Sequence, residues 1–123
     1  MDLTTEAIRL GMNMARVRAE VASANIANVD VTGYRAQRAD FGDAVGLLRE
    51  AVSDPAIAES RFADMTPAAL RSSVRPLDVG TDASESLDNQ VAELETAGTN
   101  FQSLAKIMSQ RFALMQLALA GRN

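Results

Sequence analysis

Hydrophobic residues at the N-terminal end of the chain recur with the seven-residue spacing of helices that pack side by side. One apolar row is followed, four residues later, by a second row. On a helix, two such rows fall on one face and form an a/d seam. We therefore predict a helix from about residue 4 to residue 27. Its seam residues are Leu3, Leu10, Met14, Val17 and Val21.

The C-terminal segment repeats this pattern at greater length. Its two rows predict a helix from about residue 87 to residue 120, with Ser86 as its N-cap. Acidic residues lie toward its start and basic residues toward its end, as the helix dipole favours. The predicted seam residues are Leu87, Val91, Leu94, Phe101, Ala105, Met108, Phe112 and Met115.

Further apolar residues widen the stripe near the C-terminus. Ile107 and Leu114 add a third row, and Leu117 lies outside all three rows. One interpretation is a terminal turn that is simply more apolar than the rest. The other is that several helices surround this end, so that these three residues face partners.

The middle of the chain carries weaker signals. Residues 40–52 read as a short amphipathic helix with Asp40 as its cap, and three prolines interrupt the segment after this helix. Val74, Leu77 and Val79 fit one extended strand or a loop. The predicted class is all-α, with the two long helices paired as a coiled coil. Residues 1–34 and 84–123 form the core domain, and residues 35–83 form a short irregular middle.

Two paired helices are a marginal fold on their own, because the seam buries few side chains for the backbone entropy that is lost. The middle is expected to supply no further helices for this core. We therefore infer that the chain assembles with partners, including copies of itself.

Composition removes most enzyme classes. The chain has no cysteine and no histidine, so a thiolate nucleophile, a zinc–thiolate site and the commonest general base are missing. The acidic pairs read as caps or solvated faces, and no glycine-rich phosphate loop occurs. We predict no catalytic residue, no cofactor and no metal.

Net charge and hydropathy narrow the range of possible binding partners. The net charge of −4 argues against nucleic-acid binding. The apolar stretch near the C-terminus is too short to span a membrane. The N-terminus lacks the apolar region of a cleaved signal peptide, so any export is expected to use another route.

Between the first helix and the middle, the heptad pattern stops at ASANIANVDVTGYRA. Asparagine is disfavoured inside a helix but tolerated at its end. Glycine adopts positive φ freely. Asn25 and Asn28 are therefore predicted to close the helix and Gly33 to turn the chain, while Tyr34 clamps the turn by burial.

These residues resemble the flagellar axial proteins of bacteria, and in particular their basal-body rod proteins. In that family the N-terminal helix typically ends in A-x-N-I-A-N followed by T-P-G-Y. The segment from Ala22 to Asn28, including Ile26, resembles the first motif, and Gly33-Tyr34 resembles the second. Val31-Thr32 stands where the family has Thr-Pro. RAQRADF, Ser86-Leu87-Asp88 and Phe101-Gln102 add to the likeness.

The resemblance implies a structural subunit of the flagellar rod. Such a subunit would assemble with copies of itself and with other basal-body proteins, transmit torque, and line the export channel. It would leave the cell through the flagellar type III export apparatus without a cleaved signal and lie in the basal body on the periplasmic side. Phe41 and Val45 have the spacing of an export-recognition signal, or are two buried residues. The alternative function is a soluble coiled-coil adaptor of another secretion or signalling assembly.

Overall fold

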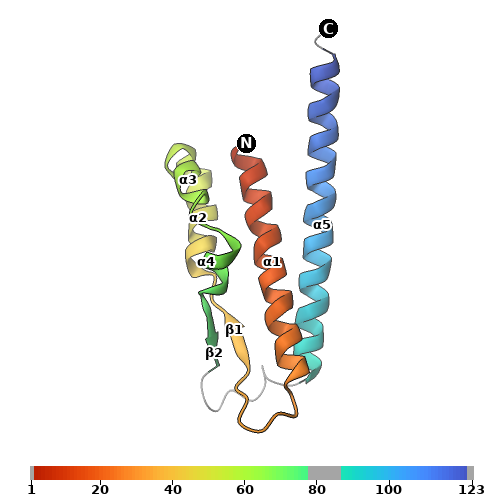
Figure 1. Ribbon diagram of the computed structural model, residues 1–123. Helices are drawn as coiled ribbons and strands as arrows, with labels where there is room; N and C mark the ends of the chain where they lie inside the picture. The colour runs from red at the N-terminus through yellow and green to blue at the C-terminus, as the bar shows by residue number, and fades with distance from the viewer. Residues whose placement is uncertain (1, 78–86, 122–123) are drawn as a thin grey trace.

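The computed structural model describes residues 2–77 and 87–121. Within these ranges the chain forms two long helices, three short helices between them and a two-stranded antiparallel sheet (Figure 1). The predicted architecture and the ends of the long helices are confirmed. The elements are α1 (Leu3–Ala27), β1 (Gln37–Ala39), α2 (Gly42–Ser53), α3 (Pro55–Phe62), α4 (Pro67–Arg71), β2 (Val74–Pro76) and α5 (Leu87–Ala120).

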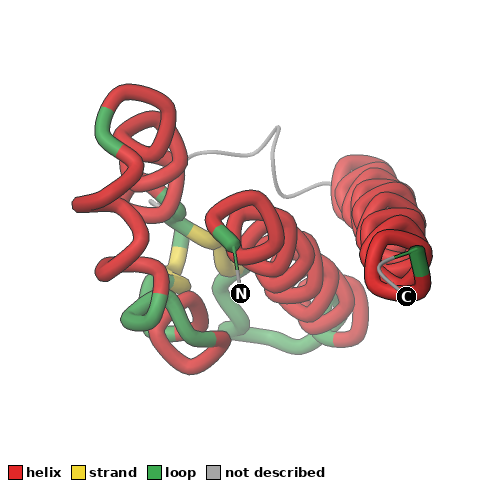
Figure 2. Tube along the Cα trace, turned by 90° about the horizontal axis from the view of Figure 1, so that it is seen from above, coloured by secondary structure: helices red, strands yellow, loops and turns green. Residues whose placement is uncertain are grey.

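Helix α1 lies at the centre of the molecule. The short helices and the two-stranded sheet lie on one side of it, and α5 runs along the other side (Figures 1 and 2). The C-terminal part of α5 continues beyond the N-terminal end of α1 (Figure 1). Helix α1 therefore has two packed faces, which have different compositions.

The bulky face of α1 packs against the middle of the chain. Leu10, Met14 and Val17 are buried in one cluster with residues of α2, α3 and α4, and Leu3 and Val21 border that cluster. The prediction that the row through Leu10 and Val17 forms the seam with the C-terminal helix is therefore wrong within the chain, whereas Met14 and Val21 each also line a cavity beside α5. The middle contributes larger side chains than α5 does, so the heptad face turns toward it. Those side chains are Phe41, Leu47, Phe62 and Leu70.

The expectation that the middle supplies no helices to the core is also wrong. Its three short helices bury Ala44, Leu47, Ala58, Phe62 and Leu70 against α1. Their amphipathic signal is weak in the sequence because each helix is short and contributes only one or two buried residues.

Small residues line much of the face of α1 that meets α5, although Ile8, seven residues before Ala15 and buried outside the core cluster, lies on the same face. Gly11 lies so close to α5 that a Cβ atom there would be 3.0 Å from Leu104 Cδ1. Ala15 and Ala22 are buried on α1, and Ala97 is buried on α5. Small side chains let the two helix backbones approach closely, but they interdigitate little.

On α5 the face toward α1 is rotated from the predicted seam. Gln90 and Ala97 are buried, and Leu94, Ala105 and Met108 are half-buried. The other five predicted residues are exposed, so they are not part of the intrachain seam. They are Leu87, Val91, Phe101, Phe112 and Met115.

The two-stranded sheet and the cap of α2 differ in detail from the prediction. Strand β2 pairs with β1 in the register Gln37↔Pro76, Arg38↔Arg75 and Ala39↔Val74. Phe41, not Asp40, is the N-cap residue of α2, although Asp40 Oδ1 accepts a hydrogen bond from the Gly42 backbone N–H at 3.2 Å. The predicted positions Ser86 and Val79 lie outside the described residues.

Candidate functional site

The chain turns sharply after α1, and two motif residues build this turn. Asn28 is the C-cap of α1, and both its backbone N–H and its side-chain Nδ2 donate to the Ala24 carbonyl, at 3.1 and 2.8 Å. Gly33 has φ of +84°, as predicted. The Tyr34 N–H donates to the Val31 carbonyl at 3.1 Å. Gly33 is thus the third residue of a β-turn, the position at which a type II turn requires positive φ.

The side chain of Asn25 uses its full hydrogen-bonding capacity inside the protein. Its Oδ1 accepts from the Gln37 backbone N–H at 2.8 Å and from the Tyr34 hydroxyl at 2.9 Å. Its Nδ2 donates to the Gln37 carbonyl and to Gln90 Oε1, both at 3.0 Å. Asn25 is only 4% exposed. One amide therefore joins α1, the turn, the start of β1 and α5.

This contact corrects the predicted role of Asn25. Asn28 ends the helix alone, whereas Asn25 lies one turn earlier and acts as a buried clamp. Tyr34 is half-buried, and it holds the turn through its hydroxyl as well as by packing. Sequence reasoning missed Gln90 altogether. Its position seven residues before the buried Ala97 is the signal that would have placed it on the same face of α5.

A second polar contact ties the other end of α1 to α5. Asp2 caps α1 through Oδ1, which accepts from the Thr5 N–H at 2.8 Å, and its Oδ2 accepts from Arg111 Nη2 at 2.7 Å. The Thr5 backbone hydrogen bond, followed by the Arg111 guanidinium, lowers the pKa of the Asp2 carboxyl. Because carboxylates are favoured at helix N-termini, the same group serves the helix and the interhelix contact.

The two contacts lie at opposite ends of a smooth seam. Between Asp2 and Asn25 the α5-facing residues of α1 include Gly11, Ala15 and Ala22, which cannot lock one position along α5 by shape. Directional hydrogen bonds supply what small side chains do not, as buried polar residues do in coiled coils. The two polar contacts therefore favour one position of α5 along α1, the buried Asn25–Gln90 bond more than the exposed Asp2–Arg111 pair.

An apolar surface remains open on α5. We call it the open stripe and define it as Leu87, Val91, Phe101, Phe112 and Met115, which are 36–48% exposed. Beyond Arg111, every described residue of α5 is exposed. Ile107, Leu114 and Leu117 widen the apolar surface there, with 45%, 65% and 69% exposure. That they face a partner remains a prediction.

The two residues with the spacing of an export signal lie in the core. Phe41 is 6% exposed, and Val45 packs against the same cluster. The guanidinium of Arg18 lies 5.2 Å above the centre of the Phe41 ring. In the folded chain both residues are structural, and a role in export recognition remains a prediction for the unfolded chain.

The motif region is also where a comparison with known proteins finds a match. Residues 9–35 match the family model of the flagella basal body rod protein. The match runs from the first half of α1 through the Asn25 clamp and the turn. It supports the rod family, a structural role and a place in the flagellar basal body.

The other comparisons add no relatives. No curated protein and no solved structure matches the chain. Among the described residues, no helix has the length and apolar character needed to cross a membrane.

Proposed function

We propose that the chain is a structural subunit of the flagellar rod, of the kind represented by the proximal rod protein FlgB. Its terminal helices assemble with copies of itself and with other rod and basal-body proteins. The product is the hollow drive shaft that transmits torque and lines the export channel. The subunit reaches this place through the flagellar type III export apparatus, without a cleaved signal peptide.

The observation that carries the proposal is the surface of α5. This helix of 34 residues buries only a narrow face against α1 and leaves the open stripe beside it. A row of exposed large apolar side chains along one helix is a feature of interaction sites. A second helix laid along the open stripe would complete the burial of α5. Helices of neighbouring subunits in a tubular assembly would supply that cover.

The domain division follows from the same arrangement. Residues 1–34 and 84–123 would form the assembly core, and residues 35–83 would form the smaller outer part. The bulky face of α1 already binds the middle of its own chain. Contacts with neighbours would therefore fall mainly on α5, which has the free surface.

Deletion and complementation test the proposal. A strain that lacks this gene should be non-motile and lack assembled rods, and the intact gene should restore both. Density for α1 and α5 in images of isolated basal bodies would place the subunit. Normal motility after deletion would contradict a rod function. A purified chain that forms only a discrete, cooperatively melting dimer or tetramer would favour the adaptor function.

A further inference from the structure

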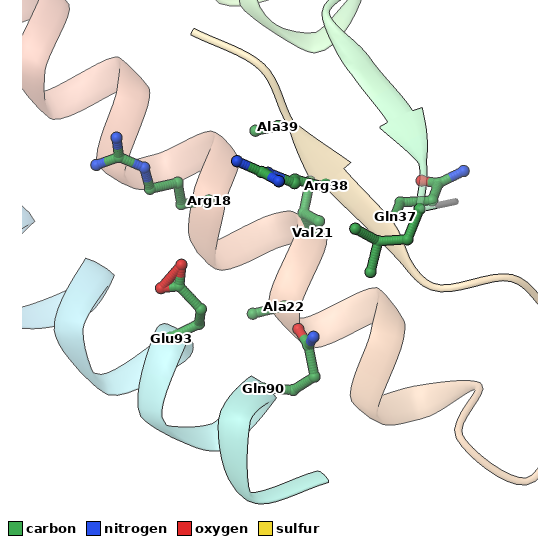
Figure 3. Close-up of a pocket in the computed structure, with 9 residues that line it drawn as sticks. Arg18, Val21, Ala22, Gln37, Arg38, Ala39, Gln90 and Glu93 are labelled. Carbon is green, nitrogen blue, oxygen red and sulfur yellow. The ribbon is translucent and has the colours of Figure 1, made fainter. Parts of the chain in front are cut away.

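A groove lies across the C-terminal half of α1, between the two-stranded sheet and the start of α5. It encloses about 410 Å³, with Arg18, Val21 and Ala22 of α1 among its lining residues (Figure 3). Residues 37–39 and Leu77 line it from the side of the two-stranded sheet, and Gln90 and Glu93 line it from α5. An adjoining cavity of about 540 Å³ shares Arg18 and Arg38 and adds Arg75. We call these two cavities together the basic groove.

Three arginines give the basic groove its character. Arg38 and Arg75 are directly opposite each other in the two-stranded sheet, an arrangement in which like charges repel. Arg18 lies over the Phe41 ring. Asp40 and Glu93 also line the two cavities, but in the described part of the chain neither is ion-paired with these arginines. A further carboxylate between Arg38 and Arg75 would relieve their repulsion.

The same chain carries an acidic and apolar projection. Val29 and Val31 are 50% and 52% exposed, and the exposed Asp30 lies between them. A separate turn of residues 28–31 holds this tip in shape, because the Val31 N–H donates to the Asn28 carbonyl at 3.0 Å. No ion pair involves Asp30 in the described ranges. The tip is at the end of the molecule where the chain leaves α1 (Figure 1).

We propose that the tip of residues 29–31 of one copy docks in the basic groove of a second copy. The Asp30 carboxylate lies between Arg38 and Arg75, and the two valines cover Val21 and Leu77. The inference rests on the proposed function, since it needs neighbouring copies. Charge complementarity and the unused apolar surface on both sides identify a second copy as the occupant.

The contact has a consequence for assembly. Tip and groove are different surfaces of one chain, so each copy offers one of each to its neighbours. Such a heterologous contact repeats without closing on itself unless the rotation closes a ring. It would therefore suit an open helical array and would act independently of the open stripe on α5.

Cysteine pairs test the contact directly, because the chain contains no cysteine. Asp30→Cys combined with Arg75→Cys should give an intermolecular disulfide ladder in oxidised basal bodies. The control combines Asp30→Cys with Arg49→Cys, which removes an exposed arginine of α2 outside the groove. We expect at least about tenfold more cross-linked dimer in the test pair than in the control. Equal cross-linking in a motile strain would overturn the inference and leave the rod function intact.

Charge exchange provides the second arm. Asp30→Arg and Arg75→Asp should each reduce incorporation into basal bodies about tenfold or more, because like charges would meet in the contact. Combining both changes in one chain should restore incorporation. Failure of the combined variant to recover would overturn the contact. A wild-type chain that never enters basal bodies would instead refute the rod function.

Discussion

The amide of Asn25 donates to Gln90 Oε1 across 3.0 Å, joining residues that are 65 positions apart in the chain. It is a buried side-chain contact between α1 and α5 in a seam whose α1 side is lined largely by small residues. The same asparagine also holds both backbone groups of Gln37. Helix pairing and the exit of the chain toward β1 are thus coupled through one side chain.

Replacing Asn25 by alanine should destabilise the protein by about 2–4 kcal/mol. The substitution removes the Asn25 hydrogen bonds to both Gln37 backbone groups and to Gln90 Oε1, and a buried polar group that loses its hydrogen bond costs about 1–3 kcal/mol. Urea unfolding followed by circular dichroism measures the loss. Asn28→Ala is the matched control and should cost less, because Asn28 is less buried and its backbone N–H retains the bond to Ala24. Equal losses of unfolding free energy in the two variants would show that the Asn25 hydrogen bonds stabilise the protein no more than the Asn28 cap does.

Thr32→Pro should stabilise the turn by about 0.4–1 kcal/mol. Thr32 precedes the positive-φ Gly33 and occupies the second position of the turn, where proline is common in type II turns. Proline at a compatible site stabilises by restricting the unfolded chain. The melting temperature of the variant, compared with that of Thr32→Ala, measures the effect. A drop relative to Thr32→Ala would show that the backbone of Thr32 does not suit proline.

Gly98→Ala should separate monomer stability from assembly. A Cβ at Gly98 meets nothing within 4 Å, so the isolated chain should gain about 0.5–1 kcal/mol of helix stability. In an assembly, the added methyl group would push away a helix packed closely on this part of α5. Incorporation into basal bodies should therefore fall while the melting temperature rises.

Gly46→Ala is the control for this prediction. Gly46 lies inside α2, also with nothing within 4 Å of an added Cβ. It should give the same gain in melting temperature and leave incorporation unchanged. If both variants assemble like the wild type, no neighbouring helix approaches α5 closely at Gly98.

A charge in the open stripe should block assembly. Phe101→Asp places a carboxylate where a neighbouring helix is expected to bury it without a partner. Because Phe101 is already 36% exposed, the isolated chain should keep its helical circular dichroism. Gln102→Asp, one position along and exposed, is the control and should assemble normally. Leu94→Asp should also block assembly, but it will destabilise the chain because Leu94 is half-buried. Normal motility with Phe101→Asp would show that the stripe is not an interface.

Acid should loosen the contact between α1 and α4. Arg71 donates two hydrogen bonds of 2.9 Å to the Glu20 carboxylate, and these hold the pKa of Glu20 below its ordinary value of 4.5. A depressed pKa in the folded state means that this stabilisation is complete above the unfolded pKa. It is lost as the pH falls through the folded value.

Glu20→Gln should therefore lower the melting temperature at neutral pH and reduce its decline below pH 4.5. Glu59→Gln removes a glutamate of α3 that has no ion pair in the described chain, and it serves as the control. Parallel melting-temperature curves for the wild type and Glu20→Gln would indicate that the Arg71 contact adds nothing to stability.

The sequence predicts the long helices well because their periodicity extends over many turns. The bounds of α5 and the end of α1 agree with the heptad pattern, and Gly33 adopts the positive φ expected of it. Periodicity does not reveal which partner a face will meet. Leu10 and Val17 of one row and Met14 of the other fit the heptad pattern, yet all three pack with α2, α3 and α4.

The buried polar contacts could not be predicted for a different reason. Nothing in the sequence pairs Asn25 with Gln90. Only the fold brings the two side chains within hydrogen-bond distance. The exposure of the open stripe on α5 could not be predicted either. A heptad row shows that a face is apolar, but Val91 and Phe101 look the same in sequence whether their cover comes from the same chain or from another.

The two packed faces of α1 also predict an order of folding. Its bulky face meets α2, α3 and α4, which all end by residue 71, whereas its small-residue face pairs with α5, which begins at residue 87. Contacts of shorter sequence separation close smaller loops and form sooner. The first part of the chain should thus collapse around α1 before α5 arrives. Helix α5 should then dock last, after the rest of the subunit has formed the surface that receives it.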